Sequence, residues 1–74
     1  MQLDRITVNP TVMGGKPCVR NMRITVSLVI NLVASGMSHR EIMDEYPDLE
    51  EEDIRQCLYY GSLAANEEYY DLAK

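Results

Sequence analysis

The apolar run from Ile24 to Ser35 is the strongest pattern in the chain, and it predicts a short helix from about Val26 onward. From Val26 onward, only Ser27, Asn31 and Ser35 interrupt the run, four residues apart. This spacing places the three polar side chains in one narrow stripe along a helix, with apolar side chains on its other sides. Such a helix must be covered nearly all round, so we expect the rest of the chain, or a second copy of it, to provide the cover. The run is too short to span a bilayer.

Residues typical of helix ends flank this run and predict a second helix after it. Thr25 is a candidate N-cap of the first helix, and Gly36 stands where a helix commonly ends in a left-handed residue. Ser38 and Glu41 have the spacing of a capping box, which predicts a second helix from about His39 to Tyr46. The proline that follows stops this helix. Its inward-facing side chains are then Ile42, Met43 and Tyr46.

The acidic run at residues 50–53 predicts the start of a third helix, because carboxylates are favoured at the positive end of a helix dipole. This helix extends from about Glu51 to at least Ala65 and has two apolar faces. The face expected in the core holds Ile54, Cys57, Leu58, Gly61, Ala64 and Ala65. The nearly opposite face holds Tyr59, Leu63 and Tyr70, and we expect an interface there because tyrosine is favoured at interfaces. In the alternative, the helix breaks near Asn66, and Tyr69 and Tyr70 fold back.

The residues before the helices predict a small β ribbon or extended arm. Residues 5–8 alternate and are rich in β-branched side chains, as in a short strand. A second extended segment at 17–20 is followed by Asn21, which tolerates the left-handed conformation of a turn. From this arm we expect three basic side chains to project: Lys16, Arg20 and Arg23.

The 74 residues carry a net charge of −5, and the charge is unevenly divided. Residues 1–37 hold four basic side chains and one acidic one, whereas residues 38–74 hold three basic and eleven acidic ones. Such a division suggests that the two ends meet different partners, although it also serves solubility. We expect one domain over residues 1–74, with a ribbon at 5–24, a three-helix bundle at 25–66 and a tail at 67–74.

The candidate chemistry is sparse, and it favours a protein that is not an enzyme. Cys18 and Cys57 lack metal-ligand spacing, and a chain without an export signal predicts reduced thiols in the cytoplasm rather than a disulfide. His39 is the one histidine and stands at an exposed helix start, where a solvated side chain is expected. The sequence therefore predicts no catalytic residues, no metal and no cofactor.

Several short motifs follow one another in order along the chain. They are Asn9-Pro10, Gly14-Gly15-Lys16-Pro17, Val19-Arg20, Arg23-Ile24, Ser35-Gly36-Met37-Ser38, Tyr46-Pro47-Asp48-Leu49 and Glu52-Asp53-Ile54. Together these motifs resemble the domain-of-unknown-function 433 family over roughly residues 5 to 65. Three residues depart from the usual family pattern: Asn21-Met22 replaces Gly-Thr, and Thr25 replaces Pro.

The resemblance implies a mainly α protein, in which a homeodomain-like helix-turn-helix bundle of three helices follows a short N-terminal β ribbon. It also implies an antitoxin of a toxin–antitoxin pair whose partner is a PIN-like nuclease toxin. It brings no catalytic residues.

Two functions follow as hypotheses, each with its own residues and with a homodimer as the expected assembly. An antitoxin-like module would cover the basic groove of a nuclease with acidic side chains, for which residues 50–53 and Asp71 are also available, and would anchor on aromatic ones. Its partner-binding residues would be Tyr59, Leu63, Tyr69, Tyr70, Glu67 and Glu68. A repressor that binds operator DNA would use the ribbon instead, because phosphates repel the acidic run of the third helix. Its DNA-binding residues would be Arg5, Lys16, Arg20 and Arg23, unless these side chains pair with the acidic half or lie in solvent.

Overall fold

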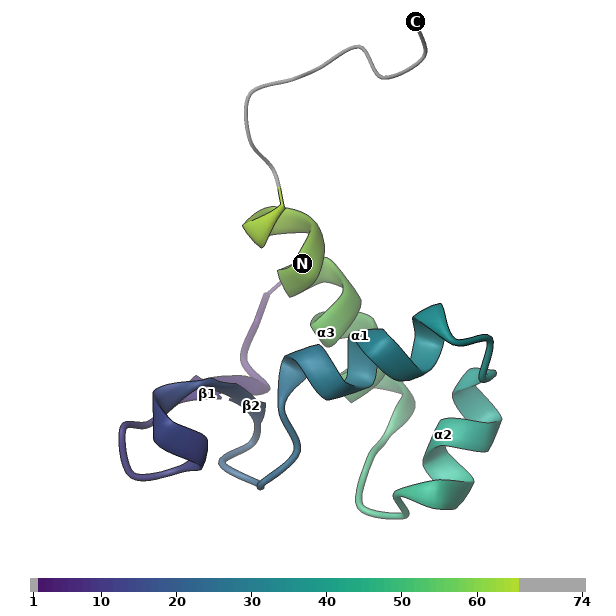
Figure 1. Ribbon diagram of the computed structural model, residues 1–74, viewed down its shortest axis with the longest axis horizontal. Helices are drawn as coiled ribbons and strands as arrows, with labels where there is room; N and C mark the ends of the chain where they lie inside the picture. The colour runs from purple at the N-terminus through teal and green to yellow at the C-terminus, as the bar shows by residue number, and fades with distance from the viewer. Residues whose placement is uncertain (1, 66–74) are drawn as a thin grey trace, which may run out of the picture.

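The computed structural model describes residues 2–65 and shows three helices that follow a two-stranded antiparallel ribbon (Figure 1). This confirms the predicted class, which is mainly helical with an N-terminal β ribbon. The predicted partner-binding residues Glu67, Glu68, Tyr69 and Tyr70 lie outside the described residues. The elements are β1 (Ile6–Val8), the 3₁₀ helix η1 (Met13–Gly15), β2 (Pro17–Val19), α1 (Val26–Ala34), α2 (His39–Glu45) and α3 (Glu51–Ala64).

The ribbon pairs β1 with β2, so that Ile6 lies opposite Val19 and Val8 opposite Pro17. The chain then turns through two left-handed residues, Arg20 with φ 46° and Asn21 with φ 59°. The left-handed turn predicted at Asn21 is confirmed. The Asn21 N–H donates to the Thr7 hydroxyl at 2.8 Å, which ties the turn back to β1.

The predicted helix ends are confirmed for α1 by local hydrogen bonds. The hydroxyl of Thr25 accepts a hydrogen bond from the Leu28 N–H at 3.1 Å. At the other end Gly36 has φ +98°, and its N–H donates to the Val33 carbonyl at 3.0 Å. A second bond from the Met37 N–H to the Leu32 carbonyl at 3.2 Å completes a Schellman motif, which satisfies two carbonyls at the end of the helix.

The starts of α2 and α3 also agree with the sequence signals. The Glu41 N–H donates to the Ser38 hydroxyl at 3.1 Å, and the Ser38 N–H donates to the Glu41 carboxylate at 2.8 Å, so the capping box is present. Helix α3 begins at Glu51, as predicted. Tyr46 is the C-cap of α2 rather than its last helical residue, and α3 ends one residue earlier than predicted.

The core lies where α1 packs against α3, with α2 and the ribbon closing its sides. The cover of α1 is less complete than predicted: Val26 and Val29 are buried, Ala34 is exposed, and the other four apolar side chains of the helix are partly buried. One prediction about the core is wrong. Ala64 and Ala65, which we placed in the core, are exposed. The buried apolar residues are Val19, Val26, Val29, Ile42, Leu49, Ile54 and Cys57, together with Cys18.

Both cysteines are buried as free thiols, Cys18 in β2 and Cys57 in α3. Burial raises the pKa of the Cys57 thiol to about 12, with a smaller contribution from the negative charge of Asp53. A thiol with so high a pKa is a poor nucleophile near neutral pH.

Among the helices of residues 2–65, none combines the length and the apolar character that a membrane span requires.

Candidate interaction surfaces

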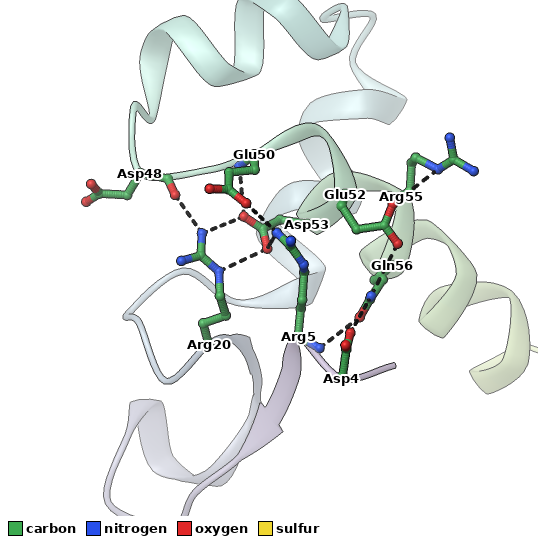
Figure 2. Close-up of polar contacts among 9 residues, drawn as sticks. All are labelled: Asp4, Arg5, Arg20, Asp48, Glu50, Glu52, Asp53, Arg55 and Gln56. Atoms are coloured by element: carbon green, nitrogen blue, oxygen red, sulfur yellow. Dashed lines mark hydrogen bonds and ion pairs between the residues drawn. The ribbon is translucent and has the colours of Figure 1, made fainter. Parts of the chain in front are cut away.

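The ribbon is fastened to the start of α3 by a buried carboxylate. The side chain of Asp53 is fully buried, and two arginines of the ribbon donate hydrogen bonds to it (Figure 2). Arg20 donates from Nε to Oδ1 at 3.1 Å and from Nη2 to Oδ2 at 2.6 Å. Arg5 donates from Nη1 to Oδ1 at 3.1 Å. We call Arg5, Arg20, Glu50 and Asp53 the arginine clamp.

The two arginines of the clamp also reach the segment before α3. Nη1 of Arg5 lies 2.6 Å from Oε1 of Glu50, and Nη2 of Arg20 donates to the carbonyl oxygen of Asp48 at 2.7 Å. Arg20 therefore joins the turn after β2, the loop between α2 and α3, and the first turn of α3. Its backbone lies in the left-handed region, which costs about 1 kcal/mol for a residue with a Cβ atom. The bidentate contact with Asp53 helps to hold this conformation.

Gln56 extends the contact between the N-terminal segment and α3 (Figure 2). Its side-chain oxygen accepts a hydrogen bond from the Arg5 N–H at 2.9 Å, and its nitrogen donates to Oδ1 of Asp4 at 2.7 Å and to Oε2 of Glu52 at 3.3 Å. The residue is only 3% exposed. Within residues 2–65, every buried side-chain nitrogen and oxygen atom has a hydrogen-bond partner, so the network is complete.

The charges of the clamp stabilise one another. Burial by itself would raise the pKa of Asp53, but the hydrogen bonds from Arg20, the Glu50 N–H and Arg5 outweigh it, and this pKa lies below its ordinary value. The hydrogen bonds to the two carboxylates raise the pKa of Arg5, and the hydrogen bond to Asp53 raises the pKa of Arg20. Asp53 and the two arginines are therefore ionised at neutral pH.

The predicted DNA-binding residues thus divide into two pairs. Arg5 and Arg20 do not project from the ribbon, because both face the start of α3; this is the alternative in which arginines pair with the acidic half of the chain. Lys16 and Arg23 are exposed and make no ion pair within residues 2–65. The acidic run is also less available to a partner than expected, because Asp53 is fully buried.

A second surface lies on the outer side of α3, where two large apolar side chains remain exposed. Tyr59 is 37% exposed and Leu63 is 46% exposed, one helical turn further along. This agrees with the prediction that the two residues lie on a face away from the core. The neighbouring Tyr60, to which we assigned no role, packs against the core instead.

A third feature is an apolar groove of about 240 Å³ between the starts of β2 and α1 and the last turns of α3. Gly61 and Ile30 both line it. A Cβ atom on Gly61 would lie 2.6 Å from Cδ1 of Ile30, so the glycine allows α1 and α3 to approach closely, as predicted. Among the residues that line the groove are Lys16, Val26, Ile30, Tyr60, Gly61 and Ala64.

His39 is not simply solvated as expected, because its Nδ1 lies 2.7 Å from Oε2 of Glu51. This contact joins the first turns of α2 and α3. In the part of the chain that the structure describes, no three His, Cys, Asp or Glu side chains gather as metal ligands would.

The role of Asp53 was missed in the sequence, although two signals for it were present. The residue stands three positions after Glu50, the spacing at which a side chain caps the start of its own helix, and its Oδ2 accepts a hydrogen bond from the Glu50 N–H at 2.8 Å. The opposite charges of the two halves were the second signal, since they permit pairing within the chain. Nothing in the sequence pattern singled out Gln56.

Similarities to known proteins agree with this architecture. Residues 6–60 match the family described as "Protein of unknown function (DUF433)". "Uncharacterized protein y4eO" of Sinorhizobium fredii (strain NBRC 101917 / NGR234) is 36% identical over 56 residues, which are 76% of this chain and 25% of that protein. The crystal structure of a DUF433 member protein from Anabaena variabilis ATCC 29413 is 30% identical with a TM-score of 0.76, and the match covers 81% of this chain and 59% of that one. The chain thus spans about a quarter of the curated relative, and it belongs to the DUF433 family.

Proposed function

We propose that this chain is a non-enzymatic, antitoxin-like protein of the cytoplasm that binds and neutralises a PIN-like nuclease toxin. The nuclease partner comes from the family resemblance, and the observation that supports a protein partner is the exposed pair Tyr59 and Leu63. Large apolar side chains that stay exposed side by side on a helix favour a contact with another protein. Tyrosine is among the residues that contribute most to such contacts.

Charge supports the same type of partner. The sequence after α3 carries the acidic residues Glu67, Glu68 and Asp71 and the aromatic residues Tyr69 and Tyr70. A nuclease must hold the phosphates of its substrate, and a basic groove serves that purpose. Acidic side chains would speed the approach of this chain to such a groove, while the tyrosines and Leu63 would supply most of the affinity.

The test is co-expression with a PIN-like nuclease encoded beside this chain's own reading frame. We expect the two proteins to co-purify and the nuclease to lose its toxicity. Replacing both Tyr59 and Leu63 by alanine should weaken binding at least tenfold, because truncating residues that dominate an interface typically costs about 2 kcal/mol or more. The stability of the free protein should change little, because both side chains are exposed.

The matched control is Val8→Ala, which shortens an apolar side chain that is 64% exposed in the ribbon. This variant should bind as tightly as the natural chain. Equal binding by the Tyr59 and Leu63 double variant would refute the proposed surface, and a neighbouring nuclease that stays active beside this chain would refute the proposed function.

A second candidate function is a dimeric repressor that binds DNA through its ribbon, and two exposed cations support it. Lys16 and Arg23 face solvent, whereas Arg5 and Arg20 are held in the arginine clamp. A mobility-shift assay at low salt with the DNA upstream of the reading frame tests this candidate. Changing both exposed cations to glutamate should abolish binding, whereas the control Arg40→Glu, on α2, should preserve it. Binding that survives the double change would exclude the ribbon as the DNA-binding element.

A further inference from the structure

The apolar groove between β2, α1 and α3 is separate from the surface that we assign to a protein partner, because neither Tyr59 nor Leu63 lines it. Its volume of about 240 Å³ is slightly below the ~300–1,000 Å³ typical of small-molecule sites. At about 30 Å³ per non-hydrogen atom, the volume that a water molecule takes in the liquid, the groove has room for about eight such atoms. Its size therefore fits a small molecule.

The groove exists because α3 carries small residues where it passes α1. Gly61 has no side chain, and Ala64, three residues later, has only a methyl group. Val26 and Ile30 of α1 and the ring of Tyr60 form apolar walls. These three residues also belong to the core or pack against it, so the walls are fixed by the fold. Binding sites for small molecules are usually pre-formed in this way.

The charge around the groove is opposite to that of the whole chain. The chain has 12 acidic and 7 basic residues, yet within residues 2–65 the groove is lined by one cation, Lys16, and by no carboxylate. Lys16 is exposed and makes no ion pair in this range. Its N–H donates to the Met13 carbonyl at 3.3 Å, and its carbonyl accepts from the Cys18 thiol at 3.3 Å, so its backbone is held in place. An apolar groove with a free ammonium group at its edge favours a ligand with an apolar body and a negative charge.

We propose that this groove binds a small carboxylic acid, with its apolar body against Ile30 and its carboxylate beside Lys16. An aromatic body suits the site best, because its ring can pack against the ring of Tyr60. The inference does not depend on the proposed nuclease partner. Lys16 also belongs to the second candidate function, and a bound carboxylate would compete there with the phosphates of DNA.

The test is a titration of the full chain with phenylacetate, followed by the methyl resonances in NMR spectra. We expect saturable shifts of the Ile30 Cδ1 and Ala64 Cβ methyl groups, with a dissociation constant of about 1 mM, as for other very small ligands. Phenylacetamide has the same shape without the charge, and it should bind about two- to fivefold more weakly.

Three outcomes of this titration would overturn the proposal. The first is the absence of saturable shifts at both methyl groups. The second is equal binding of phenylacetate and phenylacetamide, which would show that the site does not select a carboxylate. The third is a shift of the same resonances when the free protein is diluted, which would show that a second copy of the chain occupies the groove.

A pair of leucine variants tests the position of the site. Ala64→Leu places a larger side chain in the groove and should weaken phenylacetate binding at least fivefold. Ala65→Leu makes the same change at the next residue, which does not line the groove, and should leave binding unaltered. Both positions are exposed and leucine is a good helix former, so thermal melting should show that both variants fold. Equal binding by the two variants would refute the assigned site.

A pair of charge variants tests the role of Lys16. Lys16→Gln should abolish the preference for phenylacetate over phenylacetamide, because it removes the ammonium group and keeps a side chain of similar length. Arg40→Gln removes an exposed positive charge from α2 and should preserve the preference. A preference that survives Lys16→Gln would contradict the assigned contact between Lys16 and the carboxylate.

Discussion

The guanidinium of Arg20 holds the buried carboxylate of Asp53 with two hydrogen bonds, although 33 positions separate the residues in the chain. Paired hydrogen bonds of this kind are stronger and more specific in direction than single ones. The contact fixes the turn after β2 over the start of α3 (Figure 2). The ribbon is therefore part of the folded domain and not a free arm.

Replacing Asp53 by asparagine should destabilise the protein, because it removes the charge that both arginines contact. Hydrogen bonds to charged groups contribute about 1.5–3 kcal/mol, and we expect the free energy of unfolding to fall by about that amount in urea titrations. The control is Asp44→Asn, which removes the same charge from an exposed position of α2. If the two variants are equally stable, the clamp does not stabilise the fold.

The pH dependence of stability should report the same carboxylate. Because the pKa of Asp53 is lower in the folded protein than in the unfolded chain, its contribution is fully present above the unfolded value of about 3.9. It is lost as the pH falls through the lower folded value. Urea titrations from pH 7 downward should therefore show the natural chain and Asp53→Asn converging below about pH 4. A gap that stays constant to low pH would contradict the lowered pKa.

Gly61 and Ile30 should show coupled effects on stability. Alanine at position 61 gains about 1 kcal/mol of helix propensity, but its Cβ atom would meet Cδ1 of Ile30 at 2.6 Å. Valine at position 30 lacks that atom. We expect Gly61→Ala to stabilise the Ile30→Val variant by about 0.5–1 kcal/mol, and to stabilise the natural chain less. A double-mutant cycle in urea measures the difference, and strictly additive effects would mean that the contact is unimportant.

The capping box of α2 should contribute measurably to stability. Ser38→Ala removes the hydroxyl that accepts the Glu41 N–H and should cost about 1 kcal/mol. Ser62→Ala, an exposed change inside α3, should be neutral or slightly stabilising, because alanine is the better helix former. Thermal melting of the two variants checks the expectation; a lower melting temperature for Ser62→Ala than for Ser38→Ala would refute it.

The parts of the fold that follow from local signals were predictable. Thr25, Gly36 and the pair Ser38 and Glu41 each act on backbone groups within a few residues, so that short motifs suffice to place the helix ends. Asn21 is a similar case, because its tolerance for a left-handed backbone is a property of the residue itself. Each of these predictions is confirmed.

The arginine clamp was not predictable in the same way, because its members come from three separate parts of the chain. An arginine on a short strand has the same sequence pattern whether it faces solvent or a buried carboxylate.

Helical periodicity alone also did not predict which side chains are buried at the end of α3. It places Ala64 and Ala65 on the core face, but α1 has nine residues and α3 fourteen, so the last turn of α3 extends past its cover.

Asp53 completes the start of α3 and holds the ribbon with the same two oxygen atoms. A ribbon that came away would leave this carboxylate without its arginines, and a first turn that unwound would carry the carboxylate away from the ribbon. We therefore expect both to open in a single step. A protease that cleaves only unfolded segments would then detect no partly unfolded intermediate. Each molecule would be either degraded completely or left intact.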